Sequence, residues 1–157
     1  MARHITLVDA GLLSLFRALV LGQAAWPLFL HGRAGGGKTC AALALCDITI
    51  SSYQDVESLC DRTMACPEEM PGVWQEIKER PVAVLDEIGC RERVTDLHYS
   101  VVKRFSEERE RSGQIASIFV SNMSPDRLAE LYDDRIASRL LAGTHFNLDS
   151  PDRRQQA

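Results

Sequence analysis

Residues 32–39 have the spacing G-x-x-x-x-G-K-[ST], which is typical of a loop that binds the phosphates of a nucleotide. The glycines allow backbone N–H groups to curve around an anion, and the N-terminus of the following helix faces the same point. We expect Lys38 to reach the β- and γ-phosphates and the Thr39 hydroxyl to hold Mg²⁺. The residues expected to bind ATP are Gly32, Arg33, Ala34, Gly35, Gly36, Gly37, Lys38, Thr39 and Cys40.

The segments on either side of this loop give the pattern its meaning. An apolar run at 28–31 predicts a strand before the loop, and a helix-forming run at 40–45 follows it directly. A glycine-rich turn before an ordinary helix is the alternative interpretation. The strand–loop–helix context and the Lys38-Thr39 pair favour a phosphate-binding loop.

Two adjacent carboxylates, Asp86 and Glu87, follow the continuous apolar run 82–85. Such a run is typical of a parallel strand buried on both faces. We expect Asp86 to lie beside the Mg²⁺ held by Thr39, and Glu87 to orient and deprotonate a water molecule that attacks the γ-phosphate. A phosphotransferase would need to exclude that water, so the pair favours hydrolysis. The alternative is that both carboxylates simply end a strand at the protein surface.

Three further polar side chains are candidates for the same chemistry. Asn122 follows a predicted strand at 115–120, and its amide can hold the attacking water, although Asn at a strand end is also a common turn residue. Arg135 and Arg139 are four residues apart and share one face of a predicted helix. One of them can reach the γ-phosphate bound by a neighbouring subunit, as an arginine finger, which predicts an oligomer. A pair of solvated arginines is the alternative.

Strands alternate with helices along the chain, which predicts one α/β domain with a mainly parallel five-stranded sheet and helices on both faces. The predicted strands are 28–31, 47–51, 82–85, 115–120 and 145–148. The predicted helices are 11–25, 40–46, 54–60, 73–78, 95–111, 126–131 and 134–141, with Asp9 as the first N-cap and a turn or loop at 66–72. We divide the domain 1–157 into an N-terminal helix at 1–25, a core at 26–149 and a polar tail at 150–157. Ligands of such sheets bind at the carboxyl ends of the strands, where all three strand-end motifs fall.

Composition narrows the class of protein. The 157 residues are 45% hydrophobic and carry a net charge of −4, which argues against a chain that is basic overall. No apolar run approaches the roughly 20 residues that span a bilayer, so we expect no membrane association. The five cysteines are odd in number and form no C-x-x-C pair, which favours reduced thiols in a cytosolic chain over a zinc site or disulfides.

The order of these motifs resembles the AAA+ ATPases of the DnaC/DnaI helicase-loader and IstB transposition-helper group. The resemblance covers roughly residues 25–154, and its motifs are segments 32–39, 82–89, 121–122, 134–140 and 146–150. It implies nucleotide and Mg²⁺ binding by Lys38 and Thr39, Mg²⁺ binding by Asp86 and water activation by Glu87. By the same resemblance Asn122 is the sensor, Arg139 the finger, and Arg135 a second candidate for it.

The resemblance also implies partners: a replicative helicase or another DNA-processing protein, and single-stranded DNA. Only about 25 residues precede the first predicted strand, so we expect a reduced member without the N-terminal partner-binding domain. No C-terminal helical lid is expected either, as in that group. The basic residues that could contact DNA alternate with acidic ones, and a solvated helix face is the alternative; they are Arg91, Arg93, Lys103, Arg104, Arg109 and Arg111.

Three functions are therefore compatible with the sequence. The first is an ATP-hydrolysing accessory protein of DNA replication, resembling a helicase loader, or of transposition, resembling IstB. The second is a small nucleotide or small-molecule kinase that shares the phosphate-binding loop. The third is a module that binds ATP without hydrolysing it and sequesters a partner.

Overall fold

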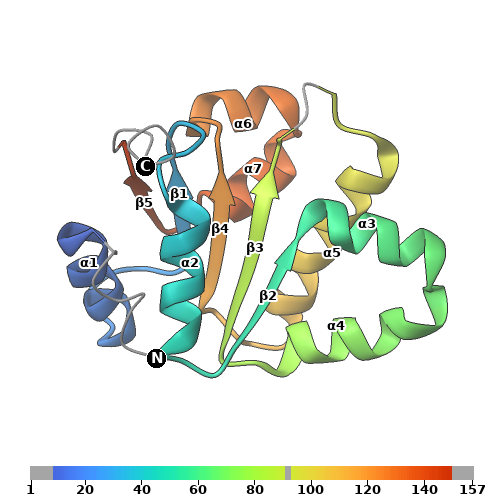
Figure 1. Ribbon diagram of the computed structural model, residues 1–157, viewed down its shortest axis with the longest axis horizontal. Coiled ribbons are helices and arrows are strands. Elements are labelled where there is room, and N and C mark those ends of the chain that lie inside the picture. Colours follow the sequence, from blue (N-terminus) through green and yellow to red (C-terminus); the bar gives the residue numbers. More distant parts are fainter. Residues whose placement is uncertain (1–8, 91–92, 150–157) are drawn as a thin grey trace.

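A computed structural model describes residues 9–90 and 93–149. Five parallel strands form one sheet in the order β2-β3-β4-β1-β5 (Figure 1). The strands are β1 (Leu28–His31), β2 (Ser51–Asp55), β3 (Val82–Ile88), β4 (Ser117–Ser121) and β5 (Thr144–Asn147). This architecture confirms the predicted α/β class.

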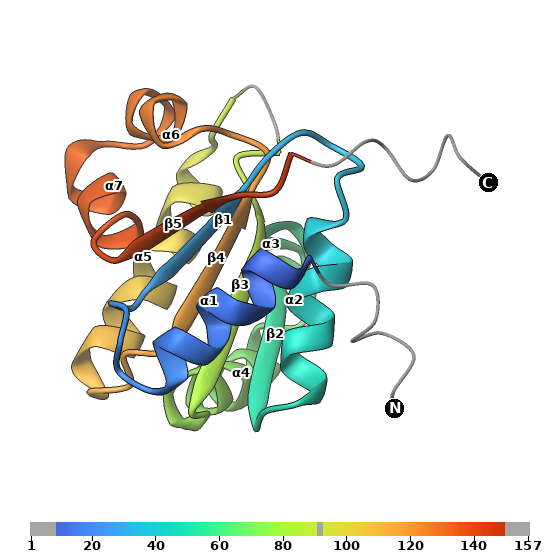
Figure 2. The same ribbon diagram turned by 90° about the vertical axis from the view of Figure 1, so that its left-hand side faces the viewer.

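Helices cover both faces of the sheet (Figures 1 and 2). Helices α1 (Ala10–Val20) and α2 (Lys38–Asp47) pack on one face. The other face carries α3 (Val56–Ala65), α4 (Met70–Glu79), α5 (Asp96–Arg111), α6 (Pro125–Leu131) and α7 (Asp134–Leu140). A short 3-10 turn at Pro67–Glu69 joins α3 to α4.

The two faces explain why the central strands are continuously apolar. In β1, Leu28 and Leu30 pack with α1 and α2, whereas Phe29 packs with the helices of the opposite face. Because successive side chains of a strand point to opposite faces, a sheet covered on both sides needs an apolar residue at every position. The structure confirms the predicted strand at 28–31, and burial on both faces explains why it is apolar.

The prediction of a strand at 47–51 is wrong, because α2 continues to Asp47 and a turn follows it. The side chains of Ile48 and Ile50 are 46% and 65% exposed, so these β-branched residues have no sheet face to pack on. The Thr49 hydroxyl donates to the Leu45 carbonyl and holds the turn against the helix. The strand forms instead at Ser51–Asp55, where the chain can pair with β3, because β propensity expresses packing on a sheet surface.

The boundaries of several helices also differ from the prediction; α3, predicted at 54–60, extends from Val56 to Ala65. The segment at 66–72, predicted as a turn or loop, contains the 3-10 turn and the start of α4. Pro71 lies in the first turn of α4, where its missing N–H leaves no intrahelical bond unmade. Helix α1 begins after its predicted N-cap Asp9 but ends at Val20 rather than residue 25, and Gly22 follows with a φ of 73°.

Ser52 on β2 is 2% exposed. Among the described residues, its hydroxyl oxygen is the one buried side-chain oxygen or nitrogen atom without a hydrogen-bond partner. We expect Ser52→Ala to raise the free energy of unfolding by about 1 kcal/mol, because a buried unsatisfied hydroxyl costs about 1–3 kcal/mol. Urea denaturation measures this change. Ser117→Ala is the matched control and should be destabilising, because the equally buried Ser117 hydroxyl accepts a hydrogen bond from Arg109 Nε. Destabilisation by Ser52→Ala would contradict the prediction.

Candidate functional site

The strand register brings the predicted motifs to one edge of the sheet. His31 at the end of β1 is paired with Ser121 at the end of β4, and Ser121 is paired with Ile88 at the end of β3. The chain following β1 is the glycine loop, residues 32–37, which leads into α2. Figure 1 shows this loop at the carboxyl ends of the strands. The end of β4 therefore lies between the glycine loop and the carboxylates of β3.

Glycine is required at the first position of the loop for steric reasons. Gly32 has a φ of 148°, and a Cβ atom there would lie 2.4 Å from the Leu148 carbonyl oxygen. The Leu148 N–H also donates to the His31 carbonyl at 2.7 Å. An exposed ion pair between Arg33 and Asp149, 3.3 Å long, joins the same two segments. The start of the loop thus lies directly against the chain that leaves β5.

Lys38 is only 6% exposed, although it carries a charge. Its Nζ atom donates to the carbonyl oxygens of Gly32 and Arg33, at 2.8 and 2.6 Å. Buried lysines are rare unless they are paired, and here the backbone of the loop provides the acceptors. The ammonium group is held against the loop, where it supplies a positive charge beside the N-terminus of α2.

Asp86 is buried, and both of its carboxylate oxygens accept hydrogen bonds. Oδ2 accepts from the Thr39 hydroxyl at 2.7 Å and from the Tyr53 hydroxyl at 2.5 Å. Oδ1 accepts from the backbone N–H of Glu87 at 2.7 Å. The structure therefore brings Thr39 and Asp86 together, although 47 residues separate them in the sequence.

Tyr53 was not among the residues selected from the sequence. It comes from β2 and is half-buried. Burial, and then the hydrogen bond to Asp86, raise the pKa of the Tyr53 hydroxyl well above its ordinary value, so this group stays protonated and donates. The only sequence signal was a tyrosine two residues before an acidic strand end, and that signal has no meaning until β2 is placed correctly.

Asp86 and Glu87 lie within β3, whereas the sequence predicted that they follow the strand. The pairing with β4 shifts register between Leu85 and Ile88, which is a β-bulge. Ile88 packs in the same core cluster as Leu85, so the residues between them do not follow strict alternation. Glu87 is exposed and has a φ of 59°, a left-handed conformation that costs about 1–3 kcal/mol for a residue other than glycine. The bulge turns the Glu87 side chain outward at the edge of the sheet.

The surroundings of Glu87 are acidic. Its pKa is raised above the ordinary glutamate value by partial burial, then by the negative charges of Asp55, Asp86 and Glu57. A carboxylate with a raised pKa holds a proton more readily once it has accepted one. This environment suits a group that takes a proton from water.

Asn122 is exposed at the end of β4, on the chain that passes between the loop and β3. The preceding residue, Ser121, fixes this position: its hydroxyl donates to the Ile88 carbonyl at 2.6 Å and accepts the Met123 N–H at 3.0 Å. Ser121 therefore ties the end of β4 to the end of the strand that carries Glu87. Sequence analysis noted Ser121 only as the neighbour of Asn122.

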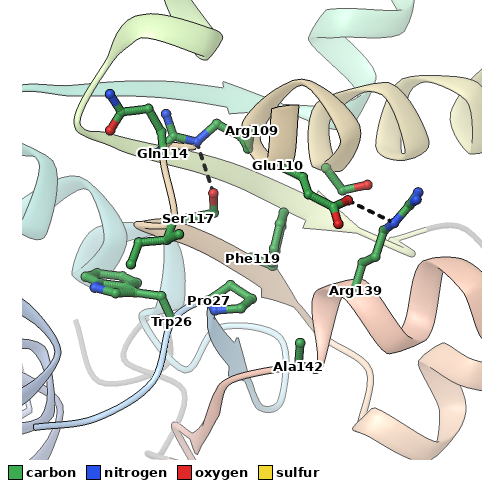
Figure 3. A pocket seen from close by; sticks show the side chains of 11 residues that line it. Trp26, Pro27, Arg109, Glu110, Gln114, Ser117, Phe119, Arg139 and Ala142 are labelled. Carbon is green, nitrogen blue, oxygen red and sulfur yellow. Dashed lines mark hydrogen bonds and ion pairs between the residues drawn. The ribbon is translucent and has the colours of Figure 1, made fainter. Parts of the chain in front are cut away.

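The two candidate finger residues, Arg135 and Arg139, belong to a further helix. Both are on α7, where Arg135 is exposed and Arg139 forms ion pairs with Glu107 and Glu110 of α5, at 3.2 and 3.3 Å. Figure 3 shows the pair with Glu110. Arg139 lines a pocket of about 240 Å³ together with Trp26 and other residues that precede β1 and β4. That pocket is at the amino ends of the strands, so Arg139 does not reach the glycine loop of its own chain.

Most of the basic residues in and just before α5 form ion pairs or hydrogen bonds with other groups of the protein. Arg109 is 2% exposed, and its guanidinium donates to Ser117 and to four backbone carbonyls. Lys103, Arg104 and Arg111 each form an ion pair with a glutamate of the same helix. Arg93 is exposed, and Arg91 lies outside the described residues. This pattern favours a solvated helix face over a strip that contacts DNA.

All five cysteines are free thiols. Among residues 9–90 and 93–149, no helix is long and apolar enough to cross a membrane, and no group of three or more His, Cys, Asp or Glu side chains is placed to hold a metal ion.

No protein-family model matches this sequence, and no curated protein is found to be similar to it. Solved structures are similar. A crystal structure of DnaI has a TM-score of 0.67 at 23% identity, with 93% of this chain and 86% of that chain covered. The DnaC helicase loader has a TM-score of 0.65 at 21% identity, with 79% and 77% covered. AMPPCP-bound DnaA from Aquifex aeolicus has a TM-score of 0.69 at 16% identity, with 94% and 47% covered.

These similarities establish the fold. The five-stranded parallel sheet with helices on both faces is shared with the DnaI, DnaC and DnaA structures, which confirms the fold that the resemblance to the DnaC/DnaI group had implied. The chain spans about half the length of the Aquifex DnaA structure, and the same share, 47%, of a DNA replication initiation factor with a TM-score of 0.66.

Proposed function

We propose that this protein binds and hydrolyses ATP with Mg²⁺ as an AAA+ accessory protein of DNA replication, acting in the manner of a helicase loader. One observation carries the ATPase proposal. The hydroxyl that ends the glycine loop, that of Thr39, lies 2.7 Å from the buried carboxylate of Asp86, and the Lys38 ammonium is held against the same loop. Hydroxyl and carboxylate oxygens are the donors that Mg²⁺ prefers, so the residues present fit this ion.

Each group at the loop has a role in binding. The N–H groups of the loop and of the first turn of α2 face the phosphates, and Lys38 offers its charge to the β- and γ-phosphates. Thr39 and Asp86 hold the metal. When bound, Mg²⁺ neutralises charge on the β- and γ-phosphate oxygens.

Glu87 is the general base of the proposed reaction. Its carboxylate orients a water molecule and accepts a proton from it as the water oxygen attacks the γ-phosphorus. The bond from that phosphorus to the bridging oxygen breaks, and ADP leaves. Asn122, at the neighbouring strand end, holds the same water by its amide without adding charge. The exposed position of Glu87 at the sheet edge favours hydrolysis over a kinase reaction, which would keep water away from the γ-phosphate.

A second subunit completes the site in this proposal. Arg139, or else Arg135, contacts the γ-phosphate bound by a neighbouring copy of the chain, which makes the active form an oligomer. Arg139 lines the pocket at the amino ends of the strands, which supports a contact with the nucleotide of a neighbouring subunit rather than with that of its own chain.

The structural neighbours support the choice of process. DnaC is described as a helicase loader, and one DnaA structure, with a TM-score of 0.64 and 17% identity, is bound to AMPPCP and single-stranded DNA. We propose a replicative helicase or another DNA-processing protein as the partner, with single-stranded DNA as a further ligand. Because most basic side chains of α5 already form ion pairs or hydrogen bonds, we propose that DNA contacts another surface.

Lys38→Ala tests nucleotide binding. We expect the affinity for a fluorescent ATP analogue with Mg²⁺ to fall about 100-fold, because a charge-assisted contact to phosphate contributes about 1.5–3 kcal/mol. Fluorescence anisotropy measures the affinity, and circular dichroism shows whether the variant folds. Lys103→Ala, on the solvated face of α5, is the matched control and should bind as the unaltered protein does. Unchanged affinity in Lys38→Ala would overturn the proposed function.

A further inference from the structure

Tyr53 occupies a defined place beside the predicted metal ligand. It is paired with Val84 in the register of β2 and β3, and Asp86 is two residues further along β3. Residues two apart in a strand share a face, and this face is the one covered by α2, which carries Thr39. The Tyr53 hydroxyl and the Thr39 hydroxyl therefore approach Asp86 from two different elements.

Both hydroxyls donate to one carboxylate oxygen. Thr39 Oγ1 and Tyr53 Oη lie 2.7 and 2.5 Å from Asp86 Oδ2, and the N–H of Glu87 occupies the other oxygen. A carboxylate with a single donor can rotate about its terminal bond. Three donors, from α2, β2 and β3 itself, fix its plane.

We propose that Tyr53 is a positioning residue of the Mg²⁺ site, which holds the Asp86 carboxylate in the orientation that the metal requires. This inference rests on the proposed ATPase function. Hydrogen-bond partners of metal-binding carboxylates typically contribute about 10- to 100-fold to metal affinity. The tyrosine ring itself packs against the apolar cluster of α1 and α2, so its apolar contacts and its hydroxyl contribute separately.

Tyr53→Phe separates these two contributions, because it removes the hydroxyl and keeps the ring. The matched control is Tyr99→Phe, which removes an exposed tyrosine–aspartate hydrogen bond, to Asp133, on the opposite face of the sheet. Mn²⁺ replaces Mg²⁺ as the probe, and electron paramagnetic resonance measures its binding to the full chain with a non-hydrolysable ATP analogue. We expect Mn²⁺ affinity to fall about 10- to 100-fold in Tyr53→Phe and less than twofold in Tyr99→Phe.

Two further measurements distinguish positioning from a general loss of structure. In Tyr53→Phe, the circular dichroism spectrum and the affinity for the nucleotide in EDTA should match those of the unaltered protein. Tyr53→Met, which also lacks the hydroxyl but keeps an apolar side chain, should lose Mn²⁺ affinity to a similar extent.

Specific outcomes overturn the inference. Unchanged Mn²⁺ affinity in Tyr53→Phe overturns the role of Tyr53 and leaves the ATPase proposal intact. An equal loss of nucleotide affinity with and without metal shows a structural role and overturns it too. Failure of the unaltered protein to bind Mn²⁺ with the nucleotide overturns the proposed function, and the role of Tyr53 with it.

Discussion

Replacement of Glu87 with glutamine is expected to slow ATP hydrolysis by about 10²- to 10⁴-fold and to leave nucleotide binding nearly unchanged. Glutamine preserves the length and shape of the side chain and can still hold water, but it cannot accept the proton. Steady-state phosphate release, with Mg²⁺-ATP and single-stranded DNA present, measures the rate. Glu130→Gln, on the exposed surface of α6, is the matched control. Turnover equal to that of the unaltered protein would show that another group is the base.

The pKa of Glu87 adds a second signature to the same variant. Because this pKa is raised, ionisation of Glu87 destabilises the fold above the ordinary glutamate pKa of 4.5. Glu87→Gln should therefore raise the melting temperature at neutral pH, and this gain should disappear as the pH falls below that value. In the unaltered protein, the hydrolysis rate should decline on acidification at a pH above 4.5.

Arg139→Ala should reduce hydrolysis by about 10³-fold or more while ATP binding is retained, because an arginine finger stabilises charge that develops only in the transition state. Arg135→Ala compares the second candidate, and Arg127→Ala on α6 is the control. The ion pairs of Arg139 with Glu107 and Glu110 predict a small loss of stability, which thermal melting separates from the loss of turnover. Exposed pairs contribute only about 0–1 kcal/mol.

Mixing variants shows whether the finger acts between subunits. Arg139→Ala retains an intact glycine loop, and Lys38→Ala retains an intact finger. When the two variants assemble together, some interfaces combine the intact loop of an Arg139→Ala subunit with the intact Arg139 of a Lys38→Ala subunit. We expect partial recovery of hydrolysis on mixing, with a maximum at an intermediate ratio. No recovery at any ratio would argue against a finger in trans.

The sequence predicted the parts of this protein that depend on local patterns. Residues 28–31 and 82–85 had to be buried strands, because continuous apolar runs need cover on both faces. The capping residue Asp9 marked the start of a helix, and its side chain does cap α1. The glycine loop was recognisable from its spacing together with the predicted strand and helix beside it.

Features that depend on strand pairing were not predictable in this way. The error at 47–51 displaced β2 by several residues and left Tyr53 outside any predicted strand, so its approach to Asp86 could not be inferred. The bulge at Glu87 likewise arises from the register of β3 against β4, which side chains far apart in the sequence determine. The partners of Arg139 belong to another helix, α5, and its ion pairs could not be inferred from the spacing of Arg135 and Arg139.

The close approach of Gly32 to Leu148 has a mechanical consequence. Among the described residues, strand β5 is at the edge of the sheet and pairs with β1 alone. A displacement of β5 would also move Gly32, the first residue of the glycine loop. The two segments are joined by the Leu148–His31 hydrogen bond and by the close approach of Gly32 to Leu148. Under the proposed function, a partner that displaces this edge strand would shift Gly32 and thereby change the affinity of the loop for the phosphates of the nucleotide.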